Sequence, residues 1–211
     1  MPTLHLLVEG EGDIQAAPIL LRRLLQEQHG RYDWQVDPKH TMKVWGLAKL
    51  RNRLPDYIEH LRNKSSCHGA MILLDLEDQL PCEEAPALAE EIAALQPLPF
   101  PIVVVFACRE YESWFLAGLA SIAMGSSHFP DGLTYPNDPE AKRGAKEELD
   151  KQMPPLVKYK EVLHQAEFTK LLNFEEARRA PSFRRLERAL GELLMAVDTD
   201  GGAGIISPRK R

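Results

Sequence analysis

The chain contains few cysteines and no long apolar run. Its three cysteines, Cys67, Cys82 and Cys108, are too few and too widely spaced to indicate a disulfide framework or a zinc site. No apolar stretch approaches the ~20 residues that a membrane-spanning helix needs. The N-terminus shows no basic region followed by an apolar core, so no secretory signal is expected. Together these absences predict a cytoplasmic protein.

Several catalytic motifs are also missing. There is no G-x-x-x-x-G-K-S/T phosphate loop and no G-x-S-x-G nucleophile motif, and Gly10-x-Gly12 lacks the third glycine of a dinucleotide fingerprint. The seven histidines include no H-x-x-x-H pair. Any metal would therefore be held by carboxylates, which favours a hard cation such as Mg²⁺ or Mn²⁺.

Charge is unevenly distributed along the chain. Residues 1–140 hold 11 basic and 20 acidic residues, whereas residues 141–211 hold 15 basic and 11 acidic. An acidic first part and a basic last part permit nucleic-acid binding without demonstrating it.

Short apolar runs alternate with helical patterns over the first 125 residues. Strands are expected at 4–8, 69–75 and 101–107, with a further strand at 32–36, whereas 40–46 is either an edge strand or a loop. Helices are expected at 14–28, 47–63, 83–95 and after residue 112, with Pro55 kinking or splitting the second. This order predicts an α/β, Rossmann-like fold with a mostly parallel four-stranded sheet flanked by helices.

The pattern changes after residue 125. Turn residues fill 126–139, and helices are expected near 140–152, 161–172 and 183–197. We therefore divide the chain into an α/β domain at 1–125, a helical C-terminal extension at 126–198 that packs on this domain, and a flexible basic tail at 199–211.

Acidic residues follow three of the expected strands: Glu9, then Asp75 and Glu77, then Glu110 and Glu112. The carboxyl ends of parallel strands share one edge of a sheet, and carboxylates brought together there repel unless a cation or proton joins them. This pattern predicts a site for one or two divalent ions. The alternatives are that Glu110 or Glu112 pairs with Arg109 and that Asp13 only caps the following helix.

Two short motifs in this order resemble the TOPRIM domain of topoisomerases, primases and OLD-type nucleases. Val8-Glu9-Gly10 followed by Asp13 resembles the V-E-G-x-x-E form of the OLD-like branch, and Asp75-Leu76-Glu77 resembles the Asp-x-Asp that follows the third strand. With the run Arg109-Glu110-Tyr111-Glu112-Ser113-Trp114, the chain resembles small standalone TOPRIM proteins of uncharacterised function, often encoded beside ATPases in bacterial defence-type operons.

That resemblance implies a divalent-metal-dependent nuclease acting on DNA or RNA, with an ATPase partner protein. Its implied metal ligands are Glu9, Asp13, Asp75, Glu77 and Glu112, and Lys142 or Arg143 would neutralise the scissile phosphate. A non-catalytic docking subunit of an ATPase complex and a small-molecule phosphohydrolase remain the alternatives, and a homo-oligomer is left open.

Overall fold

A computed structural model describes residues 1–141, 143–200, 203–204 and 206–208. The protein has an α/β fold built on a five-stranded parallel sheet, in the order β2-β1-β3-β4-β5. The strands are β1 (Thr3–Val8), β2 (Thr41–Lys43), β3 (Cys67–Leu76), β4 (Ile102–Cys108) and β5 (Ile206–Ser207). The parallel α/β architecture is confirmed, and the sheet has one strand more than expected.

The strand expected at 32–36 does not form, whereas the segment 40–46, left open as an edge strand or a loop, contains the edge strand β2. Residues 32–36 contribute only an isolated bridge between Gln35 and Thr3, whereas the short β2 pairs in parallel with β1. Trp34 and Val36 are nonetheless buried, in the cluster that includes α1 (Glu11–His29). Their apolar character therefore reflects core packing of an irregular segment and not strand formation.

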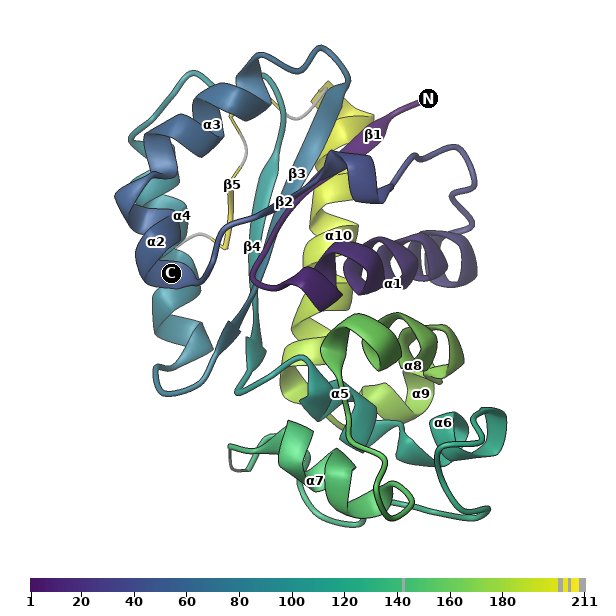
Figure 1. Cartoon of the computed structure of the whole chain (residues 1–211). Coiled ribbons are helices and arrows are strands. Elements are labelled where there is room, and N and C mark those ends of the chain that lie inside the picture. Colours follow the sequence, from purple (N-terminus) through teal and green to yellow (C-terminus); the bar gives the residue numbers. More distant parts are fainter. Residues whose placement is uncertain (142, 201–202, 205, 209–211) are drawn as a thin grey trace.

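Helices cover both faces of the sheet (Figure 1). The first face carries α1 and α10 (Pro181–Asp200), and the second carries α2 (Leu47–Asn52), α3 (Leu54–Arg62) and α4 (Pro81–Ala93). The separation of α2 from α3 confirms that the predicted helix at 47–63 is split next to Pro55. Alternate residues of β4 enter the two cores, with Val103 and Val105 on one side and Val104 and Phe106 on the other. Burial on both faces explains why this strand is apolar throughout.

The C-terminal helix is part of the main layer. Helix α10 packs along β4, and its residues Phe183, Leu186, Leu190 and Leu193 are fully buried. In the segment expected to be a tail, α10 continues to Asp200 and Ile206–Ser207 pair with β4. The rest of that segment, 201–202, 205 and 209–211, lies outside the described residues.

A group of short helices lies beyond the carboxyl edge of the sheet (Figure 1). It contains α5 (Glu112–Ala117), α6 (Leu119–Gly125), α7 (Ala145–Gln152), the π-helical turn η2 (Glu161–Gln165), α8 (Ala166–Leu171) and α9 (Phe174–Ala177). Before β2 there is a single 3₁₀ turn, η1 (Pro38–His40). Tyr111, Trp114, Phe115 and Phe168 pack in tilted and edge-to-face pairs at ring-centroid distances of 4.8–5.7 Å and join α5 to α8. In the described part of the chain, no helix is long and apolar enough to cross a membrane.

Candidate acidic site at the carboxyl edge of the sheet

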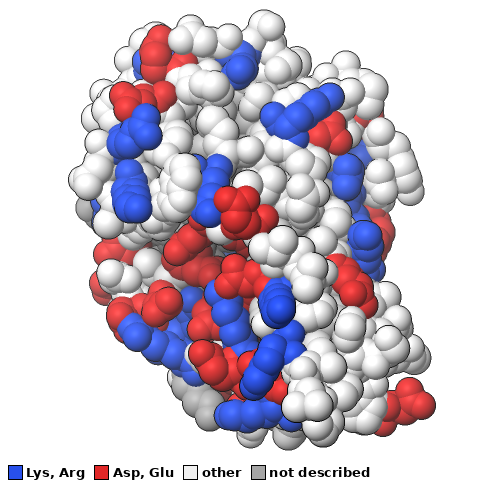
Figure 2. Space-filling model, viewed as in Figure 1, with Lys and Arg blue, Asp and Glu red and all other residues white. Residues whose placement is uncertain are grey.

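The acidic site is built from neighbouring strand ends. Glu9 follows β1, Asp75 is the penultimate residue of β3, and Glu112 begins α5 just after β4. Asp13 joins them from the first turn of α1. Figure 2 shows acidic side chains gathered in a hollow between the sheet and the short helices, with Lys and Arg around its border. This edge is where open α/β sheets carry their ligand sites.

Glu9 and Asp75 are linked directly. The Asp75 backbone N–H donates to Glu9 Oε2 at 3.3 Å, and the Tyr111 N–H donates to Asp75 Oδ1 at 2.9 Å. Burial raises the pKa of Glu9 despite the hydrogen bond from Asp75, and the charge on Asp13 raises it further. Burial also raises the pKa of Asp75 well above its usual range, and Asp13, Glu112 and Glu9 all add to this effect. The four carboxyl groups are therefore close enough to oppose one another's ionisation.

Asp13 has a structural role as well. Its Oδ2 accepts the Gly10 N–H at 2.9 Å, which closes the first turn of α1, and its Oδ1 accepts from Gln165 Nε2 at 2.8 Å. Asp13 therefore caps α1, as the alternative interpretation predicted, in addition to lying in the acidic site. The residue is also only 9% exposed, its charge raises the pKa of Glu9 and Asp75, and burial raises its own pKa.

Glu112 is the most enclosed of the four carboxylates. It is fully buried, and its Oε1 accepts a hydrogen bond of 2.7 Å from the Tyr159 hydroxyl. Its Oε2 has no hydrogen-bond partner among the described residues and lies 3.9 Å from Lys146 Nζ. Burial raises the pKa of Glu112 to about 7, although Lys146 and the Tyr159 hydroxyl lower it.

Lys146 of α7 supplies the positive charge inside the cluster. Its Nζ lies 2.5 Å from Glu161 Oε1 in η2. Burial works against the ammonium charge, but Glu112, Glu161 and Asp75 together raise the pKa of Lys146 overall. Glu110 positions this lysine, because its carboxylate accepts the backbone N–H groups of Gly144 and Lys146 at the start of α7.

Two of the predicted site residues, Glu77 and Arg143, lie at the exposed border of this cluster, where the charge of Glu77 still raises the pKa of Glu9. Glu77 lies at the rim with its side chain 59% exposed, and Arg143 pairs with it at 3.6 Å. Glu77 was expected beside Asp75 as a ligand of the same metal site, but β3 ends at Leu76, so the alternation that would turn both side chains the same way ends before Glu77. Lys142 lies outside the described residues.

Sequence reasoning missed four contributors: Lys146, Tyr159, Glu161 and Gln165. They lie in α7, η2 and the segment between them, and no local motif marks them. The folded chain brings Gln165 to Asp13 across 152 residues of sequence. The only available signal was the spacing of Glu161 and Gln165, which are four residues apart in the helix expected at 161–172 and would therefore lie on the same helix face.

The residues fit a hard divalent cation in type. All four acids offer carboxylate oxygens, and the buried Glu112 Oε2 has no hydrogen-bond partner among the described residues, so it is free to bind a cation or proton in addition to the Lys146 charge at 3.9 Å. Among the described residues, no three His, Cys, Asp or Glu side chains already form a cluster that could hold a metal ion. The Lys146 ammonium is the cation that balances the carboxylates in this arrangement.

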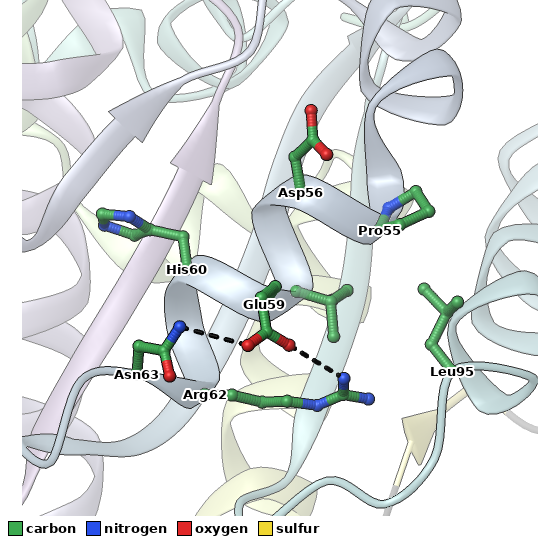
Figure 3. A pocket seen from close by; sticks show the side chains of 8 residues that line it. Pro55, Asp56, Glu59, His60, Arg62, Asn63 and Leu95 are labelled. Carbon is green, nitrogen blue, oxygen red and sulfur yellow. Dashed lines mark hydrogen bonds and ion pairs between the residues drawn. The ribbon is translucent and has the colours of Figure 1, made fainter.

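A second hollow, of about 610 Å³, lies beside α3 and Leu95 (Figure 3). Within it Glu59 accepts from both Arg62 and Asn63 at 3.2 Å. Its lining mixes acidic and basic side chains and does not gather carboxylates as the acidic site does.

The fold and this site define a parallel α/β protein with a carboxylate cluster at the carboxyl ends of its central strands. Residues 8–191 match the model of a family described as a domain of unknown function, DUF4276, and the chain belongs to that family. The matched region contains every residue of the acidic site. No curated protein and no solved structure matches the chain.

Proposed function

We propose that the protein is a divalent-metal-dependent nuclease that hydrolyses phosphodiester bonds of DNA or RNA at the acidic site. The observation that carries the proposal is the convergence of Glu9, Asp13, Asp75 and Glu112 at one sheet edge, where each carboxyl group has a raised pKa. Protein interiors rarely gather acids in this way without a cation to bind. The likeness of the Glu9 and Asp75 motifs to the TOPRIM pattern supports the same chemistry.

The four carboxylates would hold one or two Mg²⁺ or Mn²⁺ ions. Bound there, the metal supplies Lewis-acid stabilisation of the charge on the phosphate. Glu9 is half-buried and so keeps some access to solvent, and we assign it the role of accepting the proton of the attacking water. Lys146 would turn its ammonium from the carboxylates to a phosphate oxygen, the role that the resemblance implied for Lys142 or Arg143.

The deciding experiment is calorimetric titration of Mn²⁺ into the wild type and into Glu9→Ala and Asp75→Ala. We expect binding in the wild type and its loss in both variants. Asp131→Ala is the matched control, because Asp131 is exposed in a loop and should leave binding unchanged. Cleavage assays on DNA and RNA, with and without EDTA and a candidate ATPase, then test the activity.

The rival is a non-catalytic docking subunit of an ATPase complex. The ammonium of Lys146 among the carboxylates favours it, because a cluster neutralised by its own lysine can be purely structural. This rival predicts no Mn²⁺ binding even with nucleic acid present, and a loss of stability in Glu9→Ala and Asp75→Ala. That pair of results would refute the nuclease.

A further inference from the structure

Trp45 is exposed and lies in a strained stretch of backbone beside the acidic site. Its φ is 57°, in the left-handed region that bulky residues rarely adopt, and Gly46 follows at φ 95°. The residue is 55% exposed, so burial in the core does not account for this conformation. Strain of this kind persists where the surrounding structure holds a side chain in place for a function.

A pocket of about 410 Å³ opens next to Trp45. It is lined by Val44, Trp45, Lys49, Asn52, Arg53 and Tyr57, which combine two aromatic rings with two cationic side chains. The Arg53 guanidinium lies 5.6 Å from the Tyr57 ring centroid, and Lys43 Nζ lies 5.4 Å from that of Trp45. None of the described residues forms an ion pair with Lys49, so its charge faces the pocket without a partner.

The backbone joins this pocket to the acidic site. The Val44 N–H donates to the Val8 carbonyl at 2.9 Å, which ties the Trp45 segment to the end of β1 just before Glu9. Gly46 lies so close to Glu9 that a Cβ added there would be 3.5 Å from Glu9 Oε1. The pocket therefore adjoins the acidic site, and a ligand bound in the pocket would reach the carboxylates past Gly46.

We propose that this pocket binds an unpaired nucleobase, and that the substrate of the acidic site is single-stranded nucleic acid. Trp45 provides the stacking surface, and Lys49 and Arg53 bind the phosphates on either side of the stacked base. Aromatic rings interleaved with cations are the usual means by which proteins bind single strands without reading their sequence. A base paired within a duplex keeps its face covered, so a duplex cannot use the pocket. This inference rests on the proposed nuclease function and adds the form of its substrate.

The test is fluorescence anisotropy of labelled single-stranded dT and rU 12-mers and of a blunt duplex, measured in EDTA. We expect wild-type binding to both single strands and weaker binding to the duplex. Trp45→Ala should weaken single-strand binding about 5- to 150-fold, the range for losing one stacked base. Trp45→Phe should recover part of the affinity. The double variant Lys49→Ala, Arg53→Ala should weaken binding and flatten its salt dependence.

Tyr32→Ala is the matched control, because Tyr32 is 71% exposed and does not line the pocket. Acrylamide quenching gives a second measurement, since Trp34 and Trp114 are buried and Trp45 dominates the accessible fluorescence. Bound single strand should shield Trp45 from the quencher.

Equal affinities for wild type and Trp45→Ala, or tighter binding of the duplex, would overturn the proposal. Because the assay contains no divalent ion, its outcome is separate from that of the nuclease proposal. If single-strand binding depends on Trp45 but the protein does not bind Mn²⁺, the pocket proposal is supported and the nuclease proposal is refuted. If the protein binds Mn²⁺ but single-strand binding does not depend on Trp45, the nuclease proposal is supported and the pocket proposal is refuted.

Discussion

The surroundings of Asp75 and Glu112 disfavour the ionised form of both carboxyl groups. Burial is the largest cause of the raised pKa of each, and neighbouring acids add to it. The hydrogen bonds from Tyr111 to Asp75 and from Tyr159 to Glu112 offset part of this cost. Residues placed at the expense of stability are commonly residues that bind or catalyse.

We therefore expect Asp75→Asn to stabilise the metal-free protein, by on the order of 1 kcal/mol or about 2–4 °C in Tm. Asparagine keeps the oxygen that accepts the Tyr111 N–H and removes the charge. A pKa raised by folding means that the folded chain keeps a proton that the unfolded chain has lost. Stability of the wild type should then fall as pH rises above the ordinary aspartate value of about 4, and the substitution should reduce that fall.

Thermal unfolding in EDTA between pH 4 and pH 8 measures both effects. Glu77→Gln is the control, because its exposed carboxylate at the rim should change Tm little. A lower Tm for Asp75→Asn across the whole pH range would mean that the Asp75 charge stabilises the fold.

The contact between α1 and η2 sets how close Asp13 of α1 lies to Glu161 and Gln165 of η2. Gly12 is the point of closest approach, because a Cβ there would lie 2.0 Å from Gln165 Oε1 and 2.9 Å from Glu161 Cβ. The contact places Gln165 on Asp13, while Glu161 binds Lys146. One glycine thus permits the arrangement of four polar side chains.

Gly12→Ala should destabilise the protein by about 1–3 kcal/mol and weaken Mn²⁺ binding, because η2 must move away from α1. Gly191→Ala is the matched control. Gly191 lies in α10, where a Cβ would meet only His29 Cε1 at 3.6 Å, so the better helix former should stabilise by about 0.5–1 kcal/mol. Urea unfolding of both variants measures the difference. Stabilisation by Gly12→Ala would contradict the close packing of α1 on η2.

The elements that could be predicted from the sequence are those whose signal lies within a few consecutive residues. Continuous apolar runs marked β3 and β4, and Glu9 and Asp75 could be placed at the sheet edge because each adjoins its strand. The prediction of a strand at 32–36 was wrong. Trp34 and Val36 are residue types typical of strands, but here they are buried in the core from an irregular segment. Lys146 and Tyr159 could not be predicted, because only the packing of α7 on α5 and of η2 on α1 brings this part of the chain to Glu112.

At the scale of the whole molecule, the two ends of the chain form one sheet. Helix α10 covers the face of β4, and β5 pairs with the edge of that strand in register with Ile102 and Val103. Trp114 of α5 donates to the Ser182 hydroxyl at the start of α10 at 2.8 Å, which links the short helices to the same face. Residues on both sides of the division expected at residue 125 therefore contribute to one hydrophobic cluster.

A fragment of residues 1–125 should consequently fail to fold on its own. It would expose Val103 and Val105, which are buried in the cluster to which α10 contributes, and it would lack Lys146 and Tyr159 against Glu112. We expect an aggregated or unfolded fragment by circular dichroism and size exclusion, whereas the whole chain unfolds in one cooperative transition. A chain ending at residue 204 is the comparison, because it loses β5 and keeps α10, and it should fold with reduced stability. If residues 1–125 instead gave a folded monomer that binds Mn²⁺, the short helices and α10 would be accessory, and the acidic site would belong to the strand ends alone.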